Sequence, residues 1–81
     1  MRVDKFLKNS RLIKRRTVAK DACDAGRVSV NGRTAKAGTD VVIGDVITIR
    51  FGQKEISARI KDVAESVRKD DAEDMYEIIS E

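Results

Sequence analysis

Apolar residues at the start of the chain recur at the spacing of an α-helix. Val3, Phe6 and Leu7 are three and four residues apart, which places them on one face of a short helix. A second apolar stripe follows a polar interval, and Gly26 comes after it, where a left-handed C-terminal glycine cap belongs. The pattern predicts two short helices joined by a turn that begins at residues 9–10. The second stripe consists of Val18, Ala19, Ala22 and Cys23.

The pattern then changes to the alternation that is typical of β-strands. Residues 28–30 read apolar, polar, apolar, and the Asn31-Gly32 pair that follows is a strong hairpin signal. Residues 33–35 are the expected return strand. The clearest alternation covers residues 46–51, and after a turn it resumes over residues 56–61. We therefore predict an α+β fold, with two short N-terminal helices packed on a small, twisted, mostly antiparallel sheet.

The last part of the chain has a weaker pattern. Residues 66–74 are highly charged and carry no apolar stripe, so we interpret them as a solvated loop or a short helix. Residues 75–79 are apolar again and dock on the sheet, either as a strand or as a helical turn. We expect one domain over residues 1–81, with its core motif in residues 1–50 and a variable acidic extension in residues 61–81.

The composition argues against several classes of protein. The chain has no histidine and one cysteine, so an internal disulfide and the usual soft ligands of zinc are missing, and we expect no cofactor or metal. Cys23 lies on the apolar face of the second helix, which indicates packed core rather than a nucleophile. No apolar run approaches the ~20 residues of a membrane span, and the charged start is unlike a signal peptide. We predict a cytoplasmic protein without enzymatic activity.

Charge is divided unevenly along the chain. Residues 1–20 carry eight basic side chains and one acid, a balance of +7, whereas residues 51–81 have a balance of −4. This asymmetry favours a polyanionic partner for the N-terminal part. A solvated charged face and an anionic membrane surface are the alternatives, although the apolar face is narrow and lacks tryptophan. The basic residues form a helix ridge and a turn: Arg2, Lys5 and Lys8, then Arg11, Lys14, Arg15 and Arg16.

The order of short motifs resembles the S-four RNA-binding domain, which is also called the alpha-L RNA-binding fold. The resemblance covers residues 1–50 and implies the same fold for this chain. It rests on the combination of the motifs, because each one alone is weak. The motifs are Met1-Arg2-Val3-Asp4-Lys5-Phe6-Leu7, Ser10-Arg11-Leu12-Ile13-Lys14-Arg15-Arg16-Thr17, Gly26-Arg27-Val28-Ser29-Val30-Asn31-Gly32, Lys36-Ala37 and Gly44-Asp45.

The resemblance also implies which residues face RNA. Asn31, Gly32 and Lys36 match the loop after the first strand, a second contact region. Asp4 matches an acid of the motif that orients a neighbouring arginine. Arg16 is the residue expected to matter most. The RNA-facing basic positions of the family correspond to Arg2, Lys5, Arg11, Lys14, Arg15 and Arg16, and the charge pattern adds Lys8.

Within the family, the N-terminal stretch, residues 50–54 and Met75-Tyr76 together resemble the short stand-alone members from Gram-positive bacteria that act in ribosome-associated quality control. This resemblance implies binding to an obstructed large ribosomal subunit through ribosomal RNA and peptidyl-tRNA. It also implies action beside the separate factor RqcH during C-terminal alanine tailing. We expect the chain to be a monomer. A heat-shock or ribosome-assembly RNA-binding protein without a role in tailing is one alternative. A protein-interaction module that uses the acidic tail is another.

Overall fold

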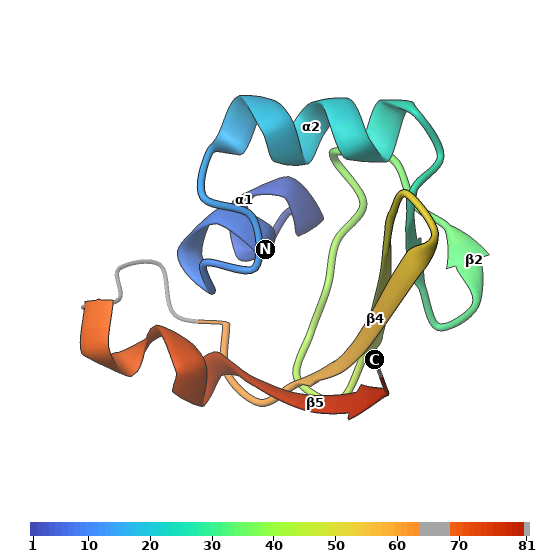
Figure 1. The fold of residues 1–81 in the computed structure, drawn as a ribbon. Coiled ribbons are helices and arrows are strands. Elements are labelled where there is room, and N and C mark those ends of the chain that lie inside the picture. The colour runs from blue at the N-terminus through green and yellow to red at the C-terminus, as the bar shows by residue number, and fades with distance from the viewer. Residues whose placement is uncertain (64–68, 81) are drawn as a thin grey trace.

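The computed structural model describes residues 1–63 and 69–80, and in them two α-helices and a 3-10 helix accompany a five-stranded sheet (Figure 1). The strands are all antiparallel in the order β2-β1-β3-β4-β5. The predicted α+β class, with two N-terminal helices beside a small antiparallel sheet, is therefore confirmed. The elements are α1 (Val3–Asn9), α2 (Arg16–Asp24), β1 (Val28–Val30), β2 (Arg33–Thr34), β3 (Val46–Phe51), β4 (Lys54–Ile60), the 3-10 helix η1 (Lys69–Met75) and β5 (Tyr76–Ser80).

The turn between the helices is organised by a buried serine. The hydroxyl of Ser10 donates to the carbonyl of Leu7 at 3.2 Å and accepts from the backbone N–H of Leu12 at 3.4 Å. Arg11, which follows, has a φ of 63° in the left-handed region. The predicted break at residues 9–10 is thus confirmed, and it turns the chain so that α2 can pack on α1.

The end of α2 and the first hairpin both depend on left-handed backbone. Gly26 has a φ of 74° and donates to the carbonyl of Cys23 at 3.0 Å, while Arg27 donates to that of Ala22 at 2.9 Å. These two bonds form the Schellman motif that a C-terminal glycine favours. Asn31 and Gly32 have φ angles of 51° and 83°, as a type I′ hairpin turn requires. Both sequence-based turn predictions are confirmed.

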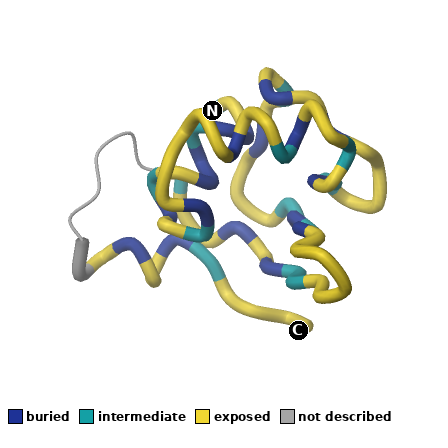
Figure 2. Tube along the Cα trace, turned by 45° about the horizontal axis from the view of Figure 1, so that its top comes forward, coloured by how far each residue is buried: buried dark blue, intermediate teal, exposed yellow. Residues whose placement is uncertain are grey.

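The core lies between the helices and one face of the sheet. Phe6 and Leu7 of α1 are fully buried and belong to the same apolar cluster as Ile47 and Ile49 of β3 and Val28 of β1. Figure 2 shows the buried residues gathered in the interior and the last strand running out exposed toward the C-terminus. The helices are therefore fixed on the sheet through their apolar faces, which leaves their polar faces for other contacts.

The N-terminus is also held by the segment between β2 and β3. The backbone N–H of Val3 donates to the carbonyl of Thr39 at 2.8 Å, and that of Val41 donates to the carbonyl of Met1 at 2.8 Å. Arg2 forms an isolated antiparallel bridge with Asp40 between these bonds. This short ladder fixes where α1 starts.

The structure decides between the strand and the helical turn that the sequence pattern leaves open for residues 75–79. Residues 76–80 form β5, which pairs with β4, so the strand interpretation is right for them. Met75 ends η1 instead and is buried, whereas Ile78 and Ile79 are exposed. Residues 64–68, which include part of the charged segment predicted to be a loop or a short helix, lie outside the described residues.

Candidate nucleic-acid interface

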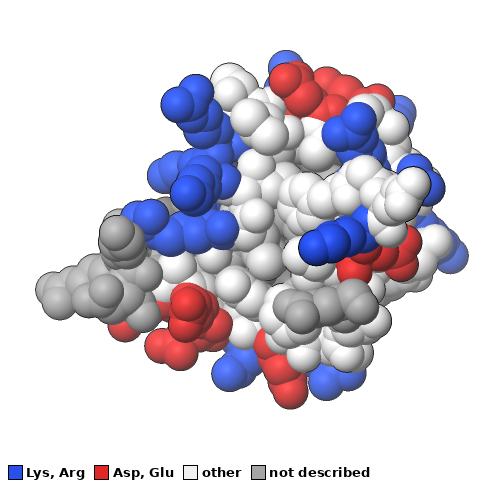
Figure 3. All heavy atoms as spheres, viewed as in Figure 1, with Lys and Arg blue, Asp and Glu red and all other residues white. Residues whose placement is uncertain are grey.

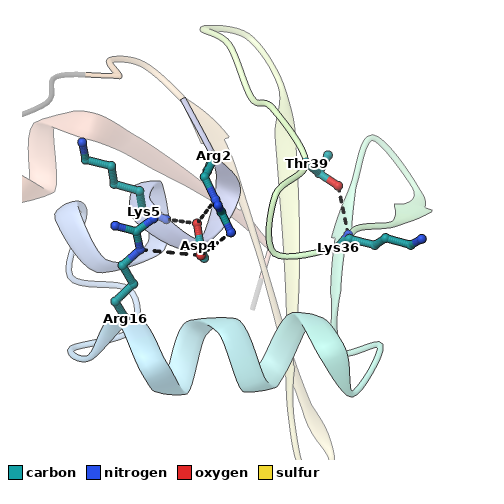
Figure 4. A network of polar contacts seen from close by, with 6 residues as sticks. All are labelled: Arg2, Asp4, Lys5, Arg16, Lys36 and Thr39. Carbon is teal, nitrogen blue, oxygen red and sulfur yellow. Dashed lines mark hydrogen bonds and ion pairs between the residues drawn. The ribbon is translucent and has the colours of Figure 1, made fainter.

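A buried carboxylate lies at the centre of the basic surface. Asp4, in the first turn of α1, leaves only 2% of its surface exposed. It accepts from Nε of Arg2 at 3.2 Å and from Nη2 of Arg2 at 3.3 Å, and Nε of Arg16 lies 3.6 Å from its Oδ2. Figure 4 shows both guanidinium groups turned toward this carboxylate, that of Arg2 from the start of α1 and that of Arg16 from the start of α2. Asp4 thus brings together two cations that are far apart in the sequence.

Both arginines contact Asp4 and yet remain exposed to solvent. About half of each side chain is exposed, 51% for Arg2 and 48% for Arg16. The buried carboxylate is stabilised by these cations, by the backbone N–H of Lys5 at 2.8 Å and by the positive end of α1. A guanidinium has five N–H donors, so each arginine keeps donors that face solvent. Such preoriented forks suit phosphate oxygens, which accept bidentate hydrogen bonds from arginine.

Arg2 has a second neighbour, Gly38, in the segment after β2. A Cβ atom built on Gly38 would lie 3.9 Å from Cζ and Nη2 of the Arg2 guanidinium. The Arg2 fork therefore lies between the carboxylate of Asp4 and this backbone. The sequence pattern does not predict the contact, because it depends on the ladder that joins the N-terminus to residues 39–41.

The other predicted basic residues lie on α1, in the turn that follows and at the start of α2. Lys8, Arg11, Lys14 and Arg15 are exposed, and Lys5 is half-buried. Arg15 is the N-cap residue of α2, and its side chain makes no capping hydrogen bond. In Figure 3 one group of Lys and Arg side chains lies together at the left of the molecule, over α1 and the start of α2, while others are spread along the right and lower edges. We call the seven predicted basic residues at the two helices and in the turn between them the helical basic face: Arg2, Lys5, Lys8, Arg11, Lys14, Arg15 and Arg16.

The two remaining site residues lie outside the two helices, Asn31 in the first hairpin turn and Lys36 in the segment after β2. Asn31 is tied into the fold, since its Oδ1 accepts from the backbone N–H of Val46 at 2.9 Å and its Nδ2 donates to Oδ1 of Asp45 at 3.1 Å. Lys36 is exposed, and its backbone N–H donates to the hydroxyl of Thr39 at 2.9 Å. In Figure 4 the Lys36 side chain points away from the cluster around Asp4. The predicted site therefore consists of two parts.

Cys23 lies behind the helical basic face, in the core. It is 3% exposed, and burial, followed by the charges of Asp4 and Asp24, raises the pKa of its thiol to about 11. A thiol with this pKa is protonated at neutral pH and is a poor nucleophile. The prediction that Cys23 is packed core is confirmed.

Two further findings concern the described part of the chain. None of its helices is long and apolar enough to cross a membrane. Residues 1–63 and 69–80 also contain no group of three or more Cys, Asp or Glu side chains arranged to hold a metal ion.

The fold, with its two N-terminal helices and the buried Asp4, points to one family of proteins. Residues 1–47 match the S4 domain, and the chain belongs to the S4 domain family. Over 81 residues it is 58% identical to the RQC P-site tRNA stabilizing factor (RqcP) of Halalkalibacterium halodurans and 52% identical to that of Bacillus subtilis. The matches cover the whole of this chain and 92% and 94% of those proteins. The expected resemblance to the short quality-control members is therefore confirmed.

A solved structure shows the same fold. The trimeric heat shock protein 15 of Vibrio cholerae superposes with a TM-score of 0.90 at 32% identity. The match covers 99% of this chain and 82% of that one. The S-four-like fold expected from the motifs is thereby confirmed.

Proposed function

We propose that this chain is a non-enzymatic, cytoplasmic RNA-binding factor of ribosome-associated quality control. It binds obstructed large ribosomal subunits, contacts ribosomal RNA and peptidyl-tRNA, and supports C-terminal alanine tailing of stalled nascent chains beside RqcH. Its full-length similarity to proteins named RQC P-site tRNA stabilizing factor supports this role. The structural observation that carries RNA binding is the pair of half-exposed arginines held by one buried carboxylate, Asp4.

The geometry favours contact with the RNA backbone over reading of bases. Guanidinium groups on a rigid helix pair recognise phosphates. Contacts to phosphates fix the position of a protein on the RNA but do not specify the RNA sequence. The chain has only three aromatic residues, and the helical basic face contains none of them. Sequence-specific binding to single strands needs aromatic side chains that stack on splayed bases. This face therefore does not bind RNA in that way. It recognises the shape and charge of a folded RNA.

We assign the contacts to both parts of the predicted site. The seven residues of the helical basic face supply the main phosphate contacts, with Arg16 and Arg2 first. Lys36 supplies charge at the second region, where Asn31 holds the loop in place and retains one amide hydrogen for RNA. The protein acts as a monomer on the subunit.

Arg16 provides the most direct test. We expect Arg16→Gln to weaken binding to large subunits that carry peptidyl-tRNA at least tenfold. We also expect the slope of log affinity against log salt to become shallower by about 1, because one phosphate contact is lost. Lys61→Gln is the matched control, since it removes one exposed positive charge outside both regions. Equal affinity and equal salt slope for the two variants would refute the proposed surface.

A second candidate function is supported by the structural likeness to heat shock protein 15. In that case the chain binds free subunits or RNA during heat shock or ribosome assembly, without a role in tailing. Co-sedimentation distinguishes the two. The quality-control role requires tighter binding to large subunits that hold peptidyl-tRNA than to empty ones, whereas equal binding to both favours the second candidate.

A further inference from the structure

The face of the sheet that points away from the core carries a row of hydroxyl groups. Ser29 of β1 pairs with Thr34 of β2 and with Thr48 of β3, and Thr48 pairs with Ser57 of β4, which pairs with Ser80 of β5. Residues directly opposite each other in antiparallel strands point to the same face. At the usual strand spacing this hydroxyl row spans about 19 Å.

Two arginines face each other at one side of the hydroxyl row. One position beyond the Val28–Ile49 pair, Arg27 lies opposite Arg50, and the backbone N–H of Arg50 donates to the carbonyl of Arg27 at 2.9 Å. Both side chains are exposed. Like charges directly opposite each other destabilise a sheet. The pair therefore weakens the free protein and is relieved when an anion binds between the two guanidinium groups.

No acid within the described chain forms an ion pair with either arginine. This holds for residues 1–63 and 69–80 and includes Glu55, which lies opposite Arg50 on β4. Within the same residues, the hydroxyls of Ser29 and Thr34 make no hydrogen bond. Arginine forks and free hydroxyls together are donors for phosphate oxygens, and Glu55 is an acceptor for a ribose hydroxyl.

These groups line one shallow depression. Its volume is about 160 Å³, and its floor is polar. The cap of α2 fixes one rim, because the Schellman motif that contains Gly26 positions Arg27. The lining residues are Gly26, Arg27, Ser29, Thr34, Thr48, Arg50 and Glu55.

We propose that the hydroxyl row and the Arg27–Arg50 pair form a second RNA-binding face, which takes the phosphate–ribose backbone of one RNA strand. The shape favours this ligand, because an open polar row suits a continuous backbone better than a single small anion. The face lies on the strands, apart from the helical basic face, so the chain contacts RNA on two sides. This inference rests on the proposed RNA-binding function.

The test compares two double variants of the full chain, with bulk transfer RNA as the probe. Arg27→Gln with Arg50→Gln removes the facing pair. Lys54→Gln with Lys61→Gln removes the same charge from exposed positions outside the depression. We expect the first to weaken binding about tenfold and to lower the salt slope by about 1 to 2, and the second to have a clearly smaller effect on both. Thermal unfolding serves as the folding check, and loss of the like-charge pair leaves the midpoint unchanged or raises it.

The Arg16→Gln variant separates failure of this inference from failure of the proposed function. If Arg16→Gln weakens binding while the two double variants behave alike, the second face is refuted and RNA binding through the helices stands. If the unchanged chain binds transfer RNA and none of the three variants differs from it, both proposed surfaces are refuted. If the unchanged chain itself does not bind RNA, the RNA-binding function is refuted. Unchanged transfer RNA binding of the Arg27/Arg50 variant would overturn the inference.

Discussion

Oδ2 of Asp4 lies 3.6 Å from Nε of Arg16, which links the first turn of α1 to the first residue of α2. The same carboxylate accepts two hydrogen bonds from Arg2. A buried acid inside a basic surface lowers the net positive charge that RNA meets. We propose that it contributes to binding by fixing the orientation of the two guanidinium groups.

Substitution of Asp4 separates these two effects. Asp4→Asn raises the net charge by one, so attraction by charge alone would tighten RNA binding. We expect the opposite, a several-fold weaker affinity, because the amide no longer fixes both guanidinium groups. Loss of the buried charged hydrogen bonds should also lower the free energy of unfolding by about 1–3 kcal/mol. The measurements are large-subunit binding at fixed salt and urea unfolding.

Asp40→Asn is the matched control for that substitution. Asp40 is exposed and pairs with Arg2 only through the backbone bridge. It carries the same charge change close to the same arginine, and we expect unchanged or slightly tighter binding. If both variants tighten binding equally, Asp4 has no positioning role.

Replacement of Arg2 by lysine tests the fork itself. Lysine keeps the positive charge but supplies a point charge instead of a planar pair of donors. We expect Arg2→Lys to leave the salt slope unchanged, because the number of phosphates contacted is the same, and to reduce affinity about three- to tenfold. Arg2→Gln should reduce both quantities. An Arg2→Lys variant with full affinity would show that Arg2 acts through charge alone.

Arg11 allows stability and binding to be changed in opposite directions. Its φ of 63° is unfavourable for a residue with a side chain. Arg11→Gly removes that strain, and we expect a free energy of unfolding that is unchanged or raised by up to about 1 kcal/mol. Arg11→Val removes the same charge and should lower it by about 1–2 kcal/mol, since a β-branched residue tolerates this conformation poorly.

RNA binding is the second property to measure for the two variants Arg11→Gly and Arg11→Val. Both variants lose one basic group of the helical basic face, so we expect the same several-fold loss of affinity at a temperature where both are folded. Thermal or urea unfolding and subunit binding measure the two properties independently. Full affinity of the glycine variant would remove Arg11 from the interface.

Cys23 predicts how stability depends on pH at the alkaline end. Burial raises the pKa of its thiol to about 11 from the ordinary value of 9.0, so the unfolded chain releases this proton at lower pH than the folded one. The contribution of the Cys23 thiol to the free energy of unfolding is complete below pH 9 and is lost as the pH rises to about 11. Relative to Cys23→Ala, the unchanged chain should lose about 2 kcal/mol between pH 8 and about pH 11. A constant difference in urea-unfolding free energy would contradict the raised pKa.

Local signals in the sequence were sufficient for the helices and turns. The spacing of Val3, Phe6 and Leu7 identified the buried face of α1, and Asn31-Gly32 identified the first hairpin. Each of these features depends on backbone preferences and on side chains a few residues apart, which a sequence pattern contains directly. The apolar residues Val42 and Ile43 show the limit of such patterns, because both are exposed at 61% and 62%.

The sequence by itself determined the α+β class, the break between the helices and the concentration of basic side chains in residues 1–20. Only the tertiary structure decided that Asp4 joins Arg2 to Arg16, and that Arg27 faces Arg50 beside a row of hydroxyls. The physical reason is that helix packing and strand register set these contacts. Both are fixed by burial of apolar side chains elsewhere in the chain, and no local spacing contains them.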